Sequence, residues 1–275
     1  PPRSTLFPYT TLFRSIFSQA AADSKNDIEH PQFFRYPQKT LWTEKFSRLF
    51  RKQKMKAINT RSENWNNFWE KSPGTAAKPS WSKLRIMSIL SRHIKPGVKV
   101  IDAGCGSGFF SSFFAASGAE VLALDYSEKA LDLCRARCPE NVTTAKFDLL
   151  QQSISSSFGS NFDLIFSDGL LEHFPFEQQK AILSNFSAAL NQNGMAVTFV
   201  PNLFSPWQLL RPFLMPGIEE KAFTLKKLIR LNELVNMKVC EASGINVIPA
   251  GFSPDSLFGK WFGMLLYTIS MANRQ

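Results

Sequence analysis

Cysteine and histidine are scarce in this sequence, and their scarcity argues against two kinds of protein. The 275 residues include four cysteines and three histidines. None of the cysteines belongs to a Cys-x-x-Cys pair, and so few thiols in a chain of this length do not form a disulfide scaffold. Histidine, cysteine and carboxylate residues do not cluster at the spacing of metal ligands, so we expect no bound metal.

One pair of cysteines lies close together in the sequence. Cys134 and Cys138 are four residues apart and share one face of a predicted helix. They fit two small, buried apolar side chains, which is the ordinary role of a free cysteine. The alternative is a thiol pair for a soft metal or metalloid.

Long apolar runs are also missing. No stretch approaches the roughly 20 apolar residues of a membrane span, and the most apolar stretch, residues 261–272, fits a strand better. The N-terminal residues lack the basic region, apolar block and cleavage site of a signal peptide. We therefore expect a cytoplasmic protein.

Acidic residues are scarce in the first third of the chain. Residues 1–99 hold 19 Lys and Arg against 6 Asp and Glu, whereas residues 100–275 hold 13 against 16. Within the basic third, residues 41–58 have the pattern of a basic amphipathic helix. Such a helix packs on the domain, contacts the anionic surface of the inner face of the membrane, or binds nucleic acid. Of these three roles, nucleic-acid binding is the least favoured.

The remaining N-terminal residues have no helical period. Ser4-Thr5-Leu6-Phe7 recurs approximately as Thr10-Thr11-Leu12-Phe13, and residues 1–15 resemble translated sequencing-adapter read-through. We therefore expect residues 1–40 to be a disordered or artefactual extension, residues 41–97 a helical cap or lid, and residues 98–275 the main domain, with a lid insertion at about 201–223.

From residue 98 the sequence alternates short apolar strands with helices. This alternation predicts an α/β fold, a doubly wound and mostly parallel sheet with helices on both faces. In such sheets ligands bind beyond the carboxyl ends of the strands. The expected strands are 98–103, 120–125, 142–147, 162–167 and 195–200, and the expected helices are 81–93, 108–117, 128–137 and 177–190.

A glycine-rich turn follows the first expected strand. It reads Asp102-Ala-Gly-Cys-Gly-Ser-Gly108, with glycines at alternate positions, so the backbone can turn tightly and approach a ligand closely. The turn leads into a helix N-terminus, which favours an anionic group. Its G-x-G-x-G spacing differs from the dinucleotide fingerprint G-x-G-x-x-G. The carboxylate of Asp102 can accept a hydrogen bond from an ammonium group, or it can hold the turn in position.

A carboxylate ends the second expected strand. Asp125 stands where other nucleotide-binding α/β domains hold two ribose hydroxyls. It could instead cap the helix that begins about three residues later. The glycine-rich turn before it favours ribose binding.

With these motifs the stretch 98–200 resembles the class I S-adenosylmethionine-dependent methyltransferases of the small-molecule type. The glycine-rich turn resembles their first motif, and Asp125-Tyr126-Ser127 their second. Asp148 resembles the residue that contacts the adenine amino group. Residues 171–174 (Leu-Glu-His-Phe) resemble the loop after strand four, and Asn193-Gly194 the turn into strand five.

The resemblance implies a cofactor, S-adenosylmethionine, whose product is S-adenosylhomocysteine. It also implies a seven-stranded sheet with a final antiparallel hairpin, which we expect at 246–250 and 261–270. The residues that we expect to bind the cofactor are Asp102, Gly104, Cys105, Gly106, Gly108, Asp125, Tyr126, Asp148, Leu149, Ser167 and Trp69.

Two residues after strand four are candidates for catalysis. Asp168 could face the methyl donor or acceptor, or serve as a loop or helix-cap carboxylate. His173 could be a general base, because imidazole titrates near neutral pH, or it could line the pocket structurally. Methyl transfer needs a base only where the acceptor must lose a proton, since positioning supplies much of the rate.

Large apolar residues outside the core pattern are candidates for the acceptor site. One group lies before the main domain and the other in the lid insertion, where Arg211 adds a charge. The second group could instead pack on the basic N-terminal helix. The residues that we expect to contact the substrate are Trp65, Phe68, Phe204, Trp207 and Arg211.

The sequence therefore favours an enzyme that methylates a small, apolar or aromatic acceptor. One alternative is an RNA or protein methyltransferase that uses the basic arm. After strand four stands Ser167-Asp168-Gly169-Leu170 in place of an Asn/Asp-Pro-Pro-Tyr motif, which argues against methylation of base amino groups. A second alternative is a non-catalytic sensor or scaffold that binds S-adenosylmethionine.

Overall fold

The computed structural model describes residues 62–71, 79–206, 208, 220–245 and 263–272. The chain divides into two units, Pro1–Lys54 and Met55–Gln275, and every described residue belongs to the second. The expectations for residues 1–40 and for the basic helix at 41–58 therefore lie outside the described residues and stay predictions. Among the described helices, none is long and apolar enough to cross a membrane.

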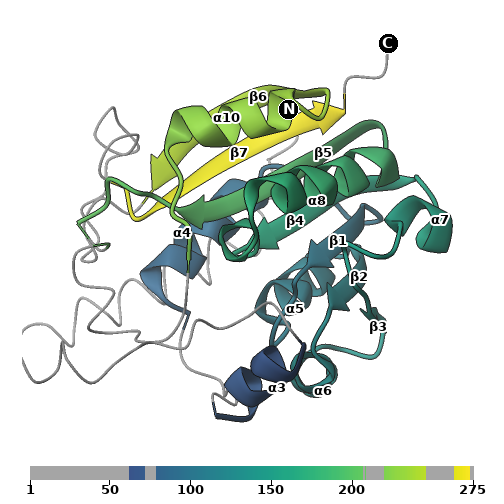
Figure 1. The fold of residues 1–275 in the computed structure, drawn as a ribbon. Helices are drawn as coiled ribbons and strands as arrows, with labels where there is room; N and C mark the ends of the chain where they lie inside the picture. Colours follow the sequence, from purple (N-terminus) through teal and green to yellow (C-terminus); the bar gives the residue numbers. More distant parts are fainter. Residues whose placement is uncertain (1–61, 72–78, 207, 209–219, 246–262, 273–275) are drawn as a thin grey trace, which may run out of the picture. The chain divides into compact units, whose positions relative to one another are not determined.

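A seven-stranded sheet organises the described residues (Figure 1). Its order is β3-β2-β1-β4-β5-β7-β6. Neighbours among the first five strands pair in parallel, and β7 pairs antiparallel with both β5 and β6. This confirms the predicted α/β fold. The strands are β1 (Lys99–Ala103), β2 (Glu120–Asp125), β3 (Val142–Lys146), β4 (Phe162–Asp168), β5 (Leu190–Pro201), β6 (Met237–Ile245) and β7 (Leu265–Ala272).

Helices cover both faces of the sheet because side chains alternate along each strand. Ile101 of β1 joins a core formed with α8 and α10, whereas its neighbour Val100 joins a core formed with α4, α5 and α6. The helices are α3 (Ser62–Lys71), α4 (Trp81–Leu90), α5 (Phe109–Ala116), α6 (Glu128–Arg137), α7 (Ile154–Phe158), α8 (Phe176–Ala189) and α10 (Leu225–Glu233), with a short 3-10 helix η1 (Leu171–His173).

The strand that pairs with β7 differs from the predicted one. The expected strand at 246–250 lies outside the described residues, and β6 (Met237–Ile245) occupies the edge of the sheet instead. Exposed Lys238 and Cys240 give β6 the polar character of an edge strand. The strand was expected at the apolar stretch 246–250, and β6 was missed because it is only partly buried.

The predicted turn at Asn193-Gly194 is part of β5 rather than a separate connection. Its register with β4 shifts between the Phe162–Leu190 and Leu164–Met195 pairs, so β5 carries extra residues there as a bulge. A Cβ at position 194 would lie 2.6 Å from the Phe162 carbonyl oxygen. Glycine is needed at this position because the two backbones approach so closely.

Candidate functional site

A cavity of about 510 Å³ lies beyond the carboxyl ends of the parallel strands, in the size range of small-molecule sites. Residues from the ends of β1, β2 and β4 line it together with α3, α4 and the loop after β4. Among the predicted site residues, those that line it are Trp65, Phe68, Trp69, Asp102, Gly104, Cys105, Gly106, Asp125, Tyr126, Asp148, Leu149, Asp168 and His173.

The glycine loop, residues 104–108, forms the floor of the cavity between β1 and α5. Gly106 has φ +52°, and a Cβ there would lie 2.7 Å from Cζ2 of Trp69. Gly108 has φ +74° and is the N-cap of α5. Both positions require glycine, since left-handed backbone and tight contact exclude other side chains. The loop therefore presents backbone to the cavity on one side and packs tightly on the other.

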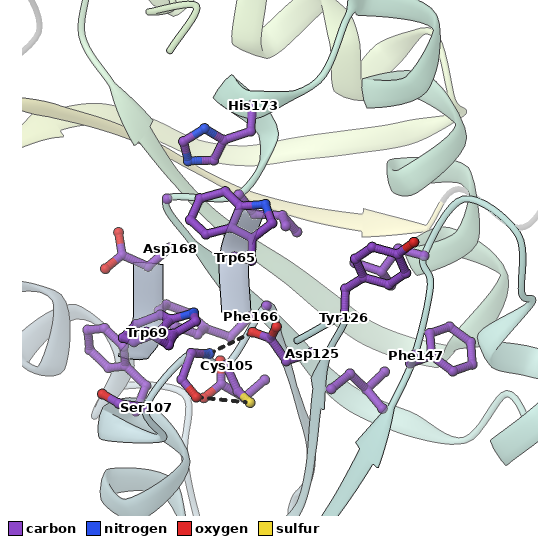
Figure 2. Close-up of a pocket in the computed structure, with 18 of the residues that line it drawn as sticks. Trp65, Trp69, Cys105, Ser107, Asp125, Tyr126, Phe147, Phe166, Asp168 and His173 are labelled. Atoms are coloured by element: carbon purple, nitrogen blue, oxygen red, sulfur yellow. Dashed lines mark hydrogen bonds between the residues drawn. The ribbon is translucent and has the colours of Figure 1, made fainter. Parts of the chain in front are cut away.

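Asp125 ties the end of β2 to the glycine loop. The backbone N–H of Gly106 donates to its Oδ2 at 2.9 Å, and that of Ser127 donates to its Oδ1 at 2.8 Å (Figure 2 shows the first of these). Burial raises the pKa of Asp125. The cap of α6 is Ser127, whose Oγ accepts from Ala130 N. Asp125 is therefore held at the cavity wall, with lone pairs that remain for ligand hydroxyls.

Asp102 lies deeper, at the end of β1. Its Oδ2 accepts a hydrogen bond from the Ser111 hydroxyl at 2.6 Å. The carboxyl is buried, and burial raises its pKa to about 7. Asp102 thus links β1 to α5 directly behind the glycine loop.

An apolar slot with one carboxylate lies past Asp125. Tyr126 and Phe147 lie on the side of the cavity away from Asp168 (Figure 2). Asp148 accepts from Leu150 N at 2.9 Å, and its own N–H donates to Gln152. The slot suits a flat ring with a polar edge.

Asp168 and Lys83 form the charged side of the cavity. Asp168 ends β4, and burial raises its pKa to about 6, while the charge of Lys83 opposes that rise. Burial, followed by the charge of Arg137, lowers the pKa of Lys83. The Lys83 ammonium also lies 4.1 Å from the centre of the Phe109 ring. This wall therefore combines a cation, which can hold an anion, with a carboxyl whose pKa of about 6 lets it accept a proton.

Aromatic side chains of α3 line the cavity from the glycine loop, where Trp69 packs on Gly106, to His173. The Trp65 ring meets the His173 ring edge to face, with centroids 4.9 Å apart, and Phe68 packs between Trp65 and Trp69. Figure 2 shows Trp65 beside His173. The Ser127 hydroxyl contacts Asn66 of the same helix and anchors it to α6.

Three neighbouring side chains, those of Glu172, His173 and Glu220, could hold a metal ion. Ligand atoms of Glu172, His173 and Glu220 lie within 4.8 Å of one another. The Lys221 N–H donates to the Glu172 carbonyl at 2.9 Å and so brings the two segments together. Among the described residues this is the group with metal-ligand chemistry, and the sequence analysis did not expect it.

The structure does not bring every predicted site residue to the cavity. Gly108 packs against Cys134 of α6. The Ser167 hydroxyl is buried in the sheet and donates to Thr198. Phe204 is 52% exposed, at the surface, and does not line the cavity. Trp207 and Arg211 lie outside the described residues.

Several lining residues were missed because no sequence signal marks them. Lys83 falls in α4, which was predicted only as a helix of the cap or lid, and Glu220 lies 47 residues beyond His173. Glu172 was part of the Leu-Glu-His-Phe motif and was not selected, although a carboxylate next to a histidine was a usable signal. These residues meet only through the tertiary fold.

Comparisons with known proteins agree with this geometry. The family model described as "Methyltransferase domain" matches residues 100–194. A ubiquinone biosynthesis O-methyltransferase of Thiobacillus denitrificans is 31% identical over 117 residues, which are 42% of this chain and 50% of that protein. A magnesium-protoporphyrin O-methyltransferase of Synechocystis is 29% identical over 106 residues, 38% and 46% of the two chains. The chain thus spans about half the length of the curated relatives it matches.

Solved structures show the same fold. The magnesium protoporphyrin IX methyltransferase of Synechocystis, with bound SAH, superposes with a TM-score of 0.57 at 16% identity, over 77% of this chain and 97% of the other. A TehB-like SAM-dependent methyltransferase of Corynebacterium glutamicum gives 0.54 at 20% identity, over the same two shares.

Proposed function

We propose that this chain, which carries a domain of the class I S-adenosylmethionine-dependent methyltransferase family, transfers a methyl group from S-adenosylmethionine to a hydroxyl oxygen of a small, largely apolar acceptor. The observation that carries the proposal is the bond between Asp125 and the Gly106 N–H at the edge of one cavity. It joins a ribose-binding carboxylate to a loop that suits an anionic group.

The cofactor half of the cavity comprises the glycine loop, Asp102, Asp125, Tyr126 and residues 147–149. In the proposal the methionine end of the cofactor lies on the glycine loop, with its carboxylate toward the backbone N–H groups. Asp125 accepts from the ribose hydroxyls. The adenine ring lies between Tyr126 and Leu149, with Asp148 toward its amino group. S-adenosylmethionine supplies an activated methyl group, attached to a sulfonium.

The acceptor half comprises Lys83, Asp168, Glu172, His173 and Glu220, together with Trp65 and Phe68 of α3, whereas Trp69 packs on the glycine loop and belongs to the cofactor half. A hydroxyl must lose its proton as its oxygen attacks the methyl carbon and the carbon–sulfur bond breaks. Asp168 is proposed as the group that accepts this proton, because a carboxyl with a pKa of about 6 is mostly ionised at neutral pH and still basic enough to act. Lys83 stabilises the developing oxyanion.

The acceptor class follows from the lining of that half. Trp65, Phe68, Phe109 and Phe174 supply apolar surface, and the charged groups of this half stand at two places, Lys83 with Asp168 and Glu172 with Glu220. Such a surface favours a flat apolar body that carries one or a few hydroxyl groups. The two curated relatives named above are O-methyltransferases, which supports oxygen as the methylated atom.

The test is a calorimetric titration of purified protein with S-adenosylmethionine and S-adenosylhomocysteine. Wild-type protein should bind both, and Asp125→Ala should lose about hundredfold in affinity, equivalent to two charge-assisted hydrogen bonds. Asp132→Ala, an exposed carboxylate on α6, is the matched control and should bind like wild type.

Turnover is then assayed by release of S-adenosylhomocysteine with a panel of hydroxylated aromatic compounds. Methylation of phenolic hydroxyls supports the proposal. A folded wild-type protein that binds neither cofactor nor product contradicts it, and binding without turnover on any acceptor class points to a sensor.

A further inference from the structure

Two thiols at the end of α6 meet behind the glycine loop, and a third, Cys105, belongs to the loop and lines the cavity. The Sγ atoms of Cys134 and Cys138 lie 3.7 Å apart, and Cys138 Sγ donates to the Gly108 carbonyl at 3.4 Å. Cys134 packs so closely on the loop that a Cβ at Gly108 would lie 2.6 Å from its Sγ. The thiol of Cys105, within the loop, donates to the Gly106 carbonyl at 3.7 Å. The proposed methyl transfer uses none of these thiols.

The backbone at the end of α6 permits a bond between two of them. The Cys138 N–H donates to the Cys134 carbonyl at 2.9 Å, so the two residues are separated by one helical turn. Cα atoms so placed lie about 6 Å apart, within the roughly 4.4–6.8 Å that disulfides span. Cys138 is the C-cap, with extended backbone at φ −84° and ψ 153°. Formation of the bond requires the sulfurs to close from 3.7 Å to about 2.0 Å.

The surroundings also favour reaction at this pair. Cys138 is partly exposed and gives an oxidant access, whereas Cys134 is buried beneath it. The two sulfurs face each other at 3.7 Å, so a thiolate formed at one of them stands next to the other thiol. A thiolate next to an accessible thiol is the arrangement of a resolving pair.

We propose that Cys134 and Cys138 form a reversible disulfide whose formation loosens the glycine loop and weakens binding of the cofactor. This coupling rests on the proposed function, because it takes the loop to be the cofactor site. The bond between sulfurs does not rest on it.

The chemistry needs a hydroperoxide as oxidant. Cys138 is oxidised first to a sulfenic acid, and hydrogen peroxide is reduced to water. The Cys134 thiolate then attacks the sulfenic sulfur, the S–S bond forms, and the hydroxyl leaves as a second water after taking up a proton. Two thiols thereby lose two protons and two electrons. A dithiol reductant reverses the reaction.

The coupling follows from the contacts with Gly108. When Cys138 Sγ turns toward Cys134 it can no longer donate to the Gly108 carbonyl, and Cys134 Sγ moves from its place against the loop. Gly108 is the N-cap of α5, so the loop and the helix N-terminus lose support together. The loss of one such bond with its packing should weaken cofactor binding about tenfold.

The experiment treats purified wild-type protein with hydrogen peroxide and then measures intact mass, peptide linkage and affinity for S-adenosylhomocysteine. We expect the loss of two hydrogens, a Cys134–Cys138 linked peptide and about tenfold weaker binding, all restored by dithiothreitol. Cys138→Ser keeps a donor for the Gly108 carbonyl and should show neither the linkage nor the change in affinity. Cys240→Ser, on the exposed edge strand β6, should behave like wild type.

Other outcomes separate this proposal from the methyltransferase assignment. A linkage through Cys105, or no linkage in folded protein, overturns it. A linkage that leaves hydrogen exchange of the glycine-loop amides unchanged overturns the coupling, whether or not a ligand binds. If reduced wild-type protein binds no S-adenosylhomocysteine, the proposed function fails while the linkage and loop exchange still decide this inference. By reciprocity, saturating S-adenosylhomocysteine binds the reduced protein more tightly and should raise the midpoint potential of the pair by about 30 mV, the equivalent of tenfold.

Discussion

The cofactor half of the cavity is held by hydrogen bonds from backbone N–H groups to the Asp125 carboxylate, within one stretch of chain, whereas the acceptor half is assembled from side chains of separate elements. Gly106 and Asp125 are 19 residues apart and joined by a direct bond. Lys83, Asp168 and Glu220 come from α4, the end of β4 and a segment before α10. The first half therefore depends on local geometry and the second on the whole fold, which lets a change in one leave the other intact.

The largest expected effect separates the halves at the chemical step. Asp168→Asn removes the proposed proton acceptor and should lower kcat about a thousandfold. Its affinity for S-adenosylmethionine should stay near that of wild type, because Asp168 is not in the cofactor half. Steady-state kinetics and calorimetry on the same preparation check this, with Asp132→Asn on α6 as the control. An equally large loss of affinity for S-adenosylmethionine would show that Asp168 also supports cofactor binding and that the two halves are not separate.

The second largest effect is expected from a substitution that changes the cofactor half alone. Gly106→Ala places a Cβ at φ +52° and 2.7 Å from the Trp69 ring, so cofactor affinity should fall about hundredfold. Gly97→Ala is the control, since Gly97 has φ +83° but no atom within 4 Å of its Cβ position. It should cost about 1 kcal/mol of stability and leave affinity unchanged. Calorimetry and thermal unfolding measure the two quantities, and equal losses of affinity would count against steric exclusion at Gly106.

A smaller effect concerns the aromatic residues of α3. Trp65→Ala removes the ring that meets His173 and should raise KM for the acceptor about tenfold, the cost of one aromatic contact. KM for S-adenosylmethionine should change much less. Phe176→Ala, an exposed aromatic residue at the start of α8, is the control. If KM rises for S-adenosylmethionine and not for the acceptor, Trp65 belongs to the cofactor half instead.

The smallest effect is a shift along the pH axis. Asp168 must be ionised to accept a proton, so kcat/KM should rise as pH increases through about 6. The Lys83 charge lowers the pKa of Asp168, and Lys83→Met should therefore move this acid limb to higher pH. Lys129→Met, on the surface of α6, should leave the limb in place. A limb that moves to lower pH would show that Lys83 does not act on Asp168.

The same contrast explains what the sequence could predict. The glycine loop, Asp125 and Asp148 follow consecutive strands, so reading the chain in order brought them to one edge of the sheet. No comparable order marks Lys83 or Glu220, because each reaches the cavity through packing of a distant element. β6 was missed for a related reason: an edge strand is half exposed, and its alternation of polar and apolar residues is weak.

The strand order has a consequence for how the sheet is completed during synthesis. β7 lies between β5 and β6, although it follows both in the chain. The five parallel strands and the cofactor half can form from residues that emerge earlier, but β6 pairs with β7 alone among the described strands. Until residues 265–272 arrive, β5 is an open edge and β6 has no place in the sheet. If synthesis stalls before this point, the chain would therefore expose a nearly finished domain with an unpaired β5 edge, which can pair with another chain.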